Sequence, residues 1–209
     1  MKRILFYGDS NTFGYDPTGL SDRYPADVRW VDIIADKLSY SLEVIPRGMN
    51  GRTIPSSINE YELLDATIKS ASPLDYFGIM LGTNDILLTG DPDYKRTAKN
   101  MELLLASLKS AMDRGKYARD SHSGKFEIIL INPPIIFPGV PKGSPMRIYE
   151  DESLLLADEY RELARKMDLI LIDAAKWNVE LSFDQVHLSE AGSIDFASKM
   201  ESALKEIIL

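Results

Sequence analysis

The stretch FYGDSNTFGY, residues 6–15, changes character abruptly at its third residue. The apolar run that begins at Ile4 ends in Gly8, and a carboxylate and a hydroxyl follow at once, on Asp9 and Ser10. A short apolar run of this kind indicates a buried strand, and the polar residues indicate a turn at its end. A plain turn explains this pattern, and so does a serine presented at the edge of a sheet as a nucleophile.

Four further apolar runs predict four further strands, and the predicted set is Arg3–Tyr7, Leu42–Ile45, Tyr76–Leu81, Glu127–Ile131 and Leu169–Ile172. Their near-continuous apolar content is typical of parallel strands that are buried on both faces. Amphipathic segments separate them, and this alternation predicts helices on both sides of the sheet. We therefore expect an α/β fold, a three-layer α/β/α sandwich whose five-stranded parallel sheet has the flavodoxin-like order 2-1-3-4-5.

Apolar residues at helical spacing predict the helices, in stripes from Val28 to Leu38, Tyr94 to Met112, Leu156 to Met167 and Ile194 to Ile207. Asp91 and Pro92 are predicted to open the second of these, and Ser189 the last, while Ser57–Glu60 fits a capping box. Two long loops interrupt the alternation, at Asp9–Asp27 and at the proline-rich Asn132–Glu150. We expect residues 1–209 to form a single domain.

Composition narrows the classes of function. The 209 residues carry a formal net charge of −8, which disfavours a nucleic-acid partner or an anionic membrane. Cysteine is absent and only two histidines occur, which excludes thiolate nucleophiles, cysteine-ligated metals and multi-histidine metal sites. We expect no cofactor and no metal. No apolar run approaches the ~20 residues needed to span a membrane, and the apolar part of the N-terminal segment is shorter than the roughly 7–15 residues of a signal peptide, so a cytoplasmic protein is expected.

Four polar segments that contain glycine or histidine follow the predicted strands or precede the last helix: residues 8–11, 47–53, 82–85 and 183–189. Ligands of open α/β sheets bind beyond the C-terminal ends of the strands, so we expect these segments to converge at one edge.

The residues in these segments suit acyl transfer. A serine hydroxyl is a weak nucleophile until a base removes its proton, and His187 can be the base for Ser10. Asp184 lies three residues before His187 and can hold its Nδ1. The oxyanion would need donors, and the candidates are the side-chain amide of Asn84, the backbone N–H of Gly51, which no Cβ blocks, and the N–H of Ser10.

These segments resemble, in order, the four blocks of the SGNH hydrolases, the GDSL-type esterases. Asp27–Trp30 and Met80–Asp85 further resemble the arylesterase/acyltransferase branch. The resemblance implies a serine esterase that hydrolyses short-chain, acetyl-type esters of small molecules, with acyltransferase or perhydrolase side activity and a homo-oligomeric state. The chain departs from the family pattern in its second block and at Asn11, which replaces a common leucine; the latter change is expected to alter the floor of the pocket.

Other interpretations stay open. A carbohydrate O-acetyl esterase would present the same carbonyl to the same triad. A flavodoxin-like FMN carrier would use residues 10–12 to hold a phosphate, and a binding module would have no catalysis. Six side chains on the two long loops either line an acyl or aryl pocket or serve loop packing or a subunit contact: Phe13, Tyr15, Tyr24, Ile135, Ile136 and Phe137.

Three charged residues and the second histidine are expected to have structural or surface roles. Asp9 and Asp85 are expected to be hydrogen-bond acceptors that fix loops. Arg52 is expected in a surface ion pair, with a substrate carboxylate as the alternative partner. His122 is expected in a solvated loop at residues 120–125.

Overall fold

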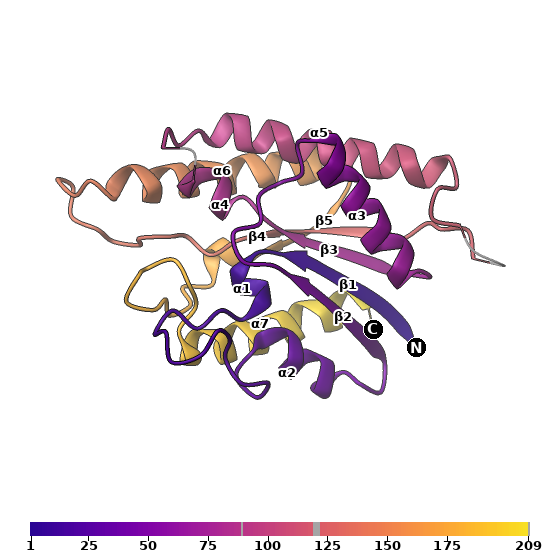
Figure 1. The fold of residues 1–209 in the computed structure, drawn as a ribbon, viewed down its shortest axis with the longest axis horizontal. Helices are drawn as coiled ribbons and strands as arrows, with labels where there is room; N and C mark the ends of the chain where they lie inside the picture. Colours follow the sequence, from indigo (N-terminus) through magenta and orange to yellow (C-terminus); the bar gives the residue numbers. More distant parts are fainter. Residues whose placement is uncertain (89, 119–121, 209) are drawn as a thin grey trace.

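The computed structural model describes residues 1–88, 90–118 and 122–208 (Figure 1). Its strands are β1 (Lys2–Gly8), β2 (Leu42–Gly48), β3 (Tyr76–Met80), β4 (Glu127–Asn132) and β5 (Ile170–Asp173). Neighbouring strands pair in parallel, in the order β2-β1-β3-β4-β5 across the sheet. The predicted α/β fold class and strand order are therefore confirmed.

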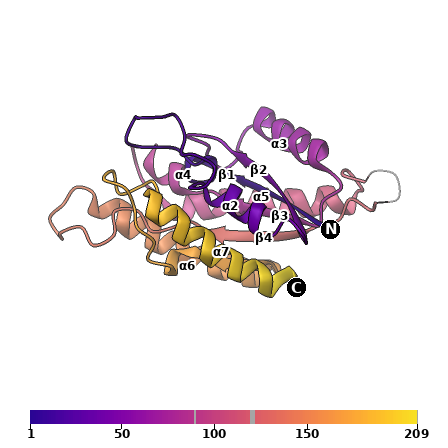
Figure 2. The ribbon, with the colours of Figure 1, turned by 90° about the horizontal axis from the view of Figure 1, so that it is seen from below.

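Helices cover both faces of this sheet. They are α1 (Ser10–Phe13), α2 (Trp30–Lys37), α3 (Ile58–Ala71), α4 (Thr83–Leu87), α5 (Tyr94–Asp113), α6 (Arg147–Met167) and α7 (Glu190–Ile208), with a short 3₁₀ turn, η1 (Ala174–Lys176), after β5. Helices α3, α5 and α6 pack on one face, and α2 and α7 on the other (Figures 1 and 2). This arrangement is the expected three-layer sandwich.

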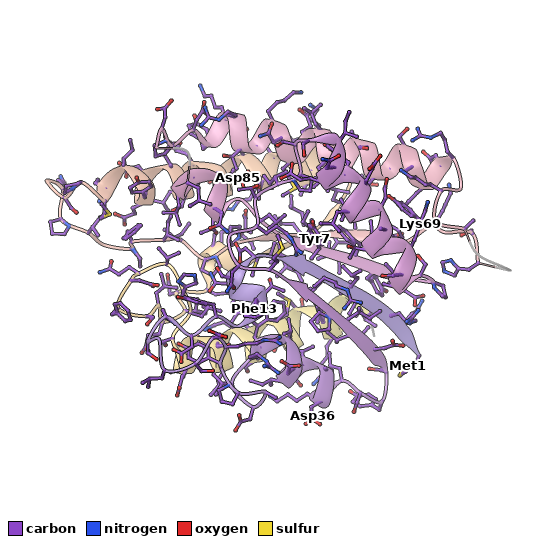
Figure 3. All side chains as sticks on the ribbon, viewed as in Figure 1. Met1, Tyr7, Phe13, Asp36, Lys69 and Asp85 are labelled. Carbon is purple, nitrogen blue, oxygen red and sulfur yellow. The ribbon has the colours of Figure 1, made fainter. Side chains whose placement is uncertain are left out.

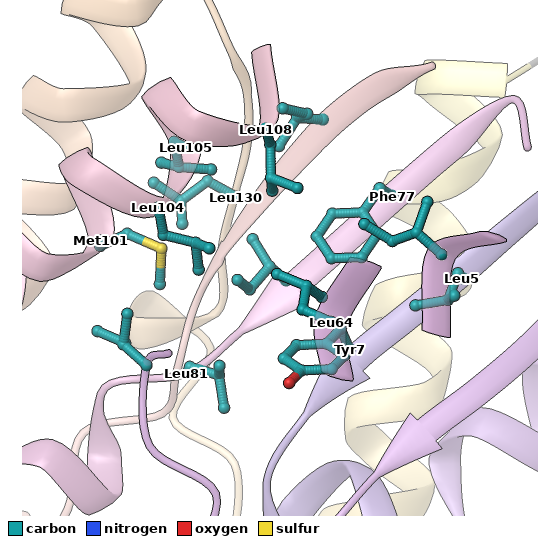
Figure 4. Close-up of a cluster of buried hydrophobic side chains, with 14 of the residues drawn as sticks. Leu5, Tyr7, Leu64, Phe77, Leu81, Met101, Leu104, Leu105, Leu108 and Leu130 are labelled. Atoms are coloured by element: carbon teal, nitrogen blue, oxygen red, sulfur yellow. The ribbon is translucent and has the colours of Figure 1, made fainter. Parts of the chain in front are cut away.

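The hydrophobic core is divided by the sheet into two clusters. Successive side chains of a strand point to opposite faces, so Leu5 and Tyr7 join the α3–α5–α6 cluster while Ile4 and Phe6 join the α2–α7 cluster. Figure 4 shows the first cluster, where Leu104, Leu105 and Leu108 of α5 face the strands. Side chains occupy both spaces between the sheet and the helical layers (Figure 3). Burial on both faces explains why the strands read as continuous apolar runs.

Strand β2 is longer than the sequence suggests. It runs to Gly48 and pairs with β1 through Pro46, which we expected to lie beyond the strand. Proline lacks a backbone N–H, and β2 lies at the edge of the sheet, where its outer side has no strand to pair with. The residue is therefore tolerated there.

The helix caps follow the sequence at two places and depart from it at a third. Ser57 and Glu60 form the predicted capping box of α3, and Ser189 accepts the N–H of Gly192 at the start of α7. The prediction for Asp91 and Pro92 is wrong, because α5 is capped by Asp93. The extended backbone of Asp93 lets its carboxylate accept the N–H of Arg96 at 2.9 Å, which Asp91 lies too early in the chain to do.

Two further expectations need correction. Ile194 is 49% exposed, and the buried face of α7 is made by residues such as Phe196 and Met200. The proline-rich loop is shorter than predicted, because α6 already begins at Arg147.

The C-terminal ends of β1, β2 and β3 lie at the same level of the sheet. Gly8 of β1 is in register with Gly48 of β2 and with Met80 of β3, so the segments that follow all leave the same edge. At that edge α1 folds back against β2. A Cβ on Gly48 would lie 2.1 Å from the backbone nitrogen of Phe13 and 2.5 Å from the carbonyl carbon of Thr12. Only glycine allows this approach.

We predict that Gly48→Ala destabilises the protein by about 1–3 kcal/mol and lowers the ester hydrolysis that the sequence predicts, because the new methyl group forces α1 away from the strand ends. Urea unfolding and kcat/KM measure the two effects. Gly143→Ala is the matched control, since a Cβ at Gly143 meets nothing within 4 Å and should leave both quantities near their original values. Equal stability of the two variants would show that the close approach of α1 is not needed.

Candidate active site

Helix α1 holds Ser10 at the C-terminal end of β1. The turn from strand to helix is sharp, and a Cβ on Gly8 would lie 2.0 Å from Oγ1 of Thr12. Asp9 caps the helix by accepting the N–H of Asn11 at 3.0 Å, and Gly14 ends it in the left-handed region at a φ of 83°. The glycine, carboxylate and hydroxyl in series thus have separate tasks: close approach, capping and presentation of the serine hydroxyl.

The side chains of Ser10, His187 and Asp184 form a continuous series of hydrogen bonds. Oγ of Ser10 lies 2.9 Å from Nε2 of His187, and Nδ1 of His187 lies 2.6 Å from Oδ2 of Asp184. The structure therefore brings together the three residues that the sequence placed in a nucleophile–base–acid series. Because Nδ1 faces a carboxylate, it carries the hydrogen, which leaves the lone pair of Nε2 toward the serine hydroxyl.

The segment before α7 folds into a compact loop that orients the acid. The other carboxylate oxygen of Asp184 accepts the backbone N–H groups of Val186 and His187, each at 3.0 Å. Burial raises the pKa of Asp184, but the hydrogen bonds from the His187 ring and from these two amides outweigh it. The pKa of Asp184 consequently lies below its ordinary value, and the side chain stays a carboxylate at neutral pH.

Asn84 lies in α4, in the segment that follows β3. Its Nδ2 donates to the carbonyl oxygen of Arg52 at 3.0 Å. An amide nitrogen carries two hydrogens, so the bond to Arg52 leaves one for a substrate oxygen.

Gly51 lies on the exposed segment after β2, with a φ of 70°. A Cβ at this position would meet no protein atom within 4 Å, so the expected access of a substrate to the Gly51 N–H stays a prediction. The positive φ, which side chains disfavour, is what calls for glycine.

Arg52 is not the surface ion pair that the sequence suggested. Its guanidinium lies over the ring of Tyr7, 4.0 Å from the centroid, and Nη1 donates to the carbonyl oxygens of Gly8, at 2.7 Å, and of Arg47. Since its own carbonyl oxygen accepts from Asn84, Arg52 connects the end of β1, the segment after β2 and α4. Sequence analysis missed this role, because the hydrogen bonds are to backbone oxygens that no motif marks.

The two acidic residues that were expected to fix loops do so. Asp9 caps α1, and both carboxylate oxygens of Asp85 lie 3.2 Å from the backbone nitrogen of Ile54. Burial raises the pKa of each carboxyl to about 6, against the lowering effect of these hydrogen bonds. Neither residue touches the imidazole through a hydrogen bond, so both act as structural acceptors at this edge.

The side chains of the two long loops have mixed environments. The ring of Tyr15 packs on that of His187 at a centroid distance of 4.8 Å. Tyr24 and Ile136 are buried, which favours loop packing, and the Tyr24 hydroxyl donates to the carbonyl of Leu188 at 3.3 Å. Phe137 packs on Tyr149, Phe13 lies under the Arg23 guanidinium, and Ile135 is half-buried.

The side chain of Asn11, which was expected to alter the floor of the pocket, is bonded to a neighbouring loop. Asn11 is 6% exposed, and its side chain is turned toward the loop that carries His187, where Nδ2 donates to the carbonyl of Val186 and Oδ1 accepts the N–H of Leu188. Its own carbonyl accepts the indole N–H of Trp30 at 2.8 Å.

The second histidine takes no part in this edge of the sheet. Nδ1 of His122 accepts the backbone N–H of Gly124 at 3.1 Å; Asp120 and Ser121 lie outside the described residues. Within residues 1–88, 90–118 and 122–208, no group of three or more histidine or acidic side chains is placed to hold a metal ion. In the same ranges no helix has the length and apolar character needed to cross a membrane.

Solved structures with the same fold include esterases of two kinds. An aryl esterase from M. smegmatis is 27% identical with a TM-score of 0.80, and the match covers 100% of each chain. A carbohydrate acetylesterase family member from Sinorhizobium meliloti is 26% identical with a TM-score of 0.80, covering 100% of this chain and 99% of the other. No protein of curated function matches the chain in sequence.

A family match covers most of the sequence. Residues 6–193 match the GDSL-like Lipase/Acylhydrolase family, a span that contains all four polar segments and the hydrogen-bonded Ser10, His187 and Asp184. The chain therefore belongs to the GDSL-like lipase/acylhydrolase family of carboxylic ester hydrolases, within the SGNH hydrolase superfamily.

Proposed function

We propose that this protein hydrolyses short-chain, acetyl-type esters with Ser10 as nucleophile, His187 as general base and Asp184 as the residue that orients the imidazole. The observation that carries the proposal is the unbroken pair of hydrogen bonds, 2.9 Å from Ser10 to His187 and 2.6 Å from His187 to Asp184. A serine in this arrangement loses its proton to Nε2 as it attacks, which is the step that an isolated hydroxyl cannot make at neutral pH.

The reaction would proceed in two halves. Oγ of Ser10 attacks the ester carbonyl carbon while its proton passes to Nε2 of His187, and the resulting imidazolium is stabilised by the carboxylate of Asp184. Collapse of the tetrahedral intermediate breaks the ester C–O bond, and the imidazolium gives its proton to the departing alcohol. Water then attacks the acyl-serine with the same general base, which releases the acid and restores the Ser10 hydroxyl.

The negative oxygen of the intermediate needs hydrogen-bond donors. The free hydrogen of Asn84 Nδ2 is one candidate, and the backbone N–H groups of Gly51 and Ser10 are the others. Asn84 is the best supported, because its bond to the Arg52 carbonyl fixes the amide plane and so the direction of the second hydrogen.

Two observations favour a small acyl group. Tyr24 and Ile136, which were candidates to line a pocket, are buried in loop and core packing and are not available to line a deep acyl channel. One of the similar structures is a carbohydrate acetylesterase family member, a name that refers to the small acetyl group. Acyl transfer to alcohols or peroxide, a homo-oligomeric state and a cytoplasmic location belong to the same proposal.

A carbohydrate O-acetyl esterase is the second candidate, favoured by the 26% identity to the Sinorhizobium meliloti protein over the whole chain. Its reaction differs from that of the first candidate only in the alcohol that leaves, and the triad does not select that alcohol. The FMN-carrier interpretation has less support, because the side chains of Ser10 and Asn11 are already hydrogen-bonded to the loop that contains His187.

Replacing the nucleophile tests the reaction itself. Ser10→Ala is expected to lower kcat for p-nitrophenyl acetate by about 10³-fold or more, since loss of the nucleophile leaves only catalysis by the oxyanion donors and by binding. The circular dichroism spectrum should not change. An organophosphonate should label the unaltered protein once, at Ser10, which also separates an enzyme from an inactive binding module. Activity within tenfold of the original would contradict the assignment.

The substrate class is tested by comparing kcat/KM for p-nitrophenyl esters from acetate to palmitate with kcat/KM for acetylated sugars. The maximum is expected between acetate and butyrate. Higher kcat/KM for acetylated sugars than for aryl acetates would favour the second candidate. A maximum at long chains would rule out the short-acyl proposal, while leaving the role of Ser10 intact.

The pH dependence tests Asp184. A protonated imidazole cannot accept the Ser10 proton, so kcat/KM should fall as the pH drops through the range in which histidines titrate. The pKa of Asp184 is below its ordinary value, so its negative charge persists throughout that range and favours the imidazolium. Asp184→Asn removes this charge. It should lower kcat/KM by about 10³–10⁴-fold, because the imidazole loses the partner that fixes its tautomer. An unchanged kcat/KM would exclude Asp184 from the triad.

A further inference from the structure

The side chain of Asn11 contacts the chain on both sides of His187. Its Nδ2 donates to the carbonyl oxygen of Val186 at 3.2 Å, and its Oδ1 accepts the backbone N–H of Leu188 at 2.9 Å. These two residues are the neighbours of His187 in sequence, so one amide group holds the backbone that carries the imidazole. Asn11 is itself the neighbour of Ser10 and is only 6% exposed.

We propose that Asn11 is a positioning residue that sets the distance between Ser10 and His187. The proposal deepens the function proposed above and rests on it, because the distance matters only if His187 takes the proton of Ser10. The side-chain hydrogen bonds of Asn11 go to the backbone on either side of His187 and not to the Ser10 hydroxyl or the imidazole. Asn11 acts through the backbone of Val186 and Leu188, which it ties to the helix that presents the serine.

The backbone of the histidine loop shows why a second anchor is needed. The N–H of His187 donates to Asp184 and its carbonyl accepts from Ser182 at 2.7 Å, so both groups of His187 are satisfied within the loop. These bonds shape the loop but do not fix it relative to Ser10. Besides the imidazole, the polar contacts between the loop and α1 are the two made by Asn11.

Asn11 is in turn held from the other side. Its backbone N–H donates to Asp9, and its carbonyl accepts the indole N–H of Trp30. Trp30 is 1% exposed and packs edge-on against Phe6 of β1 at a centroid distance of 5.0 Å. Asn11 therefore links the loop that carries His187 to the buried core.

Asparagine is suited to this task because its side chain offers a donor and an acceptor in one plane. Aspartate at this position would keep the acceptor for Leu188 but set an oxygen against the carbonyl of Val186. Leucine would leave the half-buried carbonyl of Val186 and the buried N–H of Leu188 without these partners, and the loop would shift to find others. Because proton transfer needs hydrogen-bonding contact, a shift of about 1 Å in Nε2 is enough to slow it.

The test uses Asn11→Leu and Asn11→Asp in the full chain. Both are expected to lower kcat for p-nitrophenyl acetate by about 10–100-fold, while KM stays within about threefold. The rate of Ser10 labelling by an organophosphonate should fall by the same factor as kcat. A purely structural role would lower the unfolding midpoint without this selective loss at temperatures where the variants are folded.

Asn132→Leu is the matched control. Asn132 is also a buried asparagine, and its Nδ2 donates to the carbonyl of Ala157 and to Asp173, away from the histidine loop. The substitution should lower the unfolding midpoint but leave kcat and the labelling rate within about threefold. If Asn132→Leu lowers kcat as much as Asn11→Leu does, the effect of Asn11 is general destabilisation and the proposal fails.

The remaining outcomes separate the two proposals. Folded Asn11 variants with kcat within twofold of the original, beside an inactive Ser10→Ala, overturn the positioning role alone. An active Ser10→Ala overturns the proposed function. If both Asn11 variants fail to fold, hydrogen exchange in the unaltered protein decides: slow exchange is expected for the Asn11 side-chain amide and the Leu188 N–H together, and fast exchange of either contradicts the contact.

Discussion

The hydrogen bond between Oγ of Ser10 and Nε2 of His187 joins residues that lie 177 positions apart, and it depends on contacts from several segments at this edge of the sheet. Neither of the two segments that hold these residues is stable alone. Helix α1 has four residues, and the segment from Ser182 to Leu188 is mostly turn, so local propensity gives little help. The 2.9 Å contact must be set by tertiary packing.

That packing begins with the sheet. The register of Gly8 with Gly48 and Met80 brings the ends of β1, β2 and β3 to one level, and the glycines let α1 fold directly over them. Arg52 then ties the same three strand ends together, because its guanidinium donates to the Gly8 carbonyl while its own carbonyl accepts from Asn84. The serine helix and the candidate oxyanion donor therefore share one backbone framework, and a displacement of either is felt by the other.

Much of this could be predicted from the sequence, for a physical reason. Buried parallel strands leave continuous apolar runs, and a parallel sheet sends the segments after its strands to one edge. The sequence alone therefore predicts that Ser10, Asn84, Asp184 and His187 lie together. The predictions that failed concern contacts between distant segments or choices among near neighbours. Asn11 bonds to residues 175 and 177 positions away through backbone atoms, which leave no mark in the sequence.

Gly48 is an example of a contact between distant segments, and the start of α5 is an example of a choice among near neighbours. The need for glycine at position 48 is visible only once α1 is known to fold back on β2. At the start of α5, two acidic residues flank Pro92, and either fits a capping pattern. The backbone at Asp93 is extended, so its side chain reaches the first turn, and tertiary placement decides between two locally acceptable starts.

The acidic residues at this edge act on stability in opposite directions. Burial raises the folded-state pKa of Asp9 and Asp85 to about 6, above the ordinary ~3.9 of an unfolded aspartate, so the folded protein binds protons that the unfolded chain does not. Their contribution is most favourable below that ordinary value and is lost as the pH rises through about 6. At neutral pH each of the two carboxylates therefore lowers the free energy of unfolding by on the order of 3 kcal/mol.

Asp184 has the opposite sign. Hydrogen bonds from the His187 ring and from two backbone amides hold its pKa below the ordinary value, so its contribution is present above that value and is lost as the pH falls through the folded-state pKa. At neutral pH, therefore, the acid that faces the imidazole stabilises the fold, while the two acids that fix α1 and the segment before α3 weaken it. Each of those two nevertheless accepts a backbone N–H that would otherwise be buried without a partner, on Asn11 and on Ile54. The strand ends are thus held by charged acceptors under the same neutral conditions in which an uncharged imidazole can accept the serine proton.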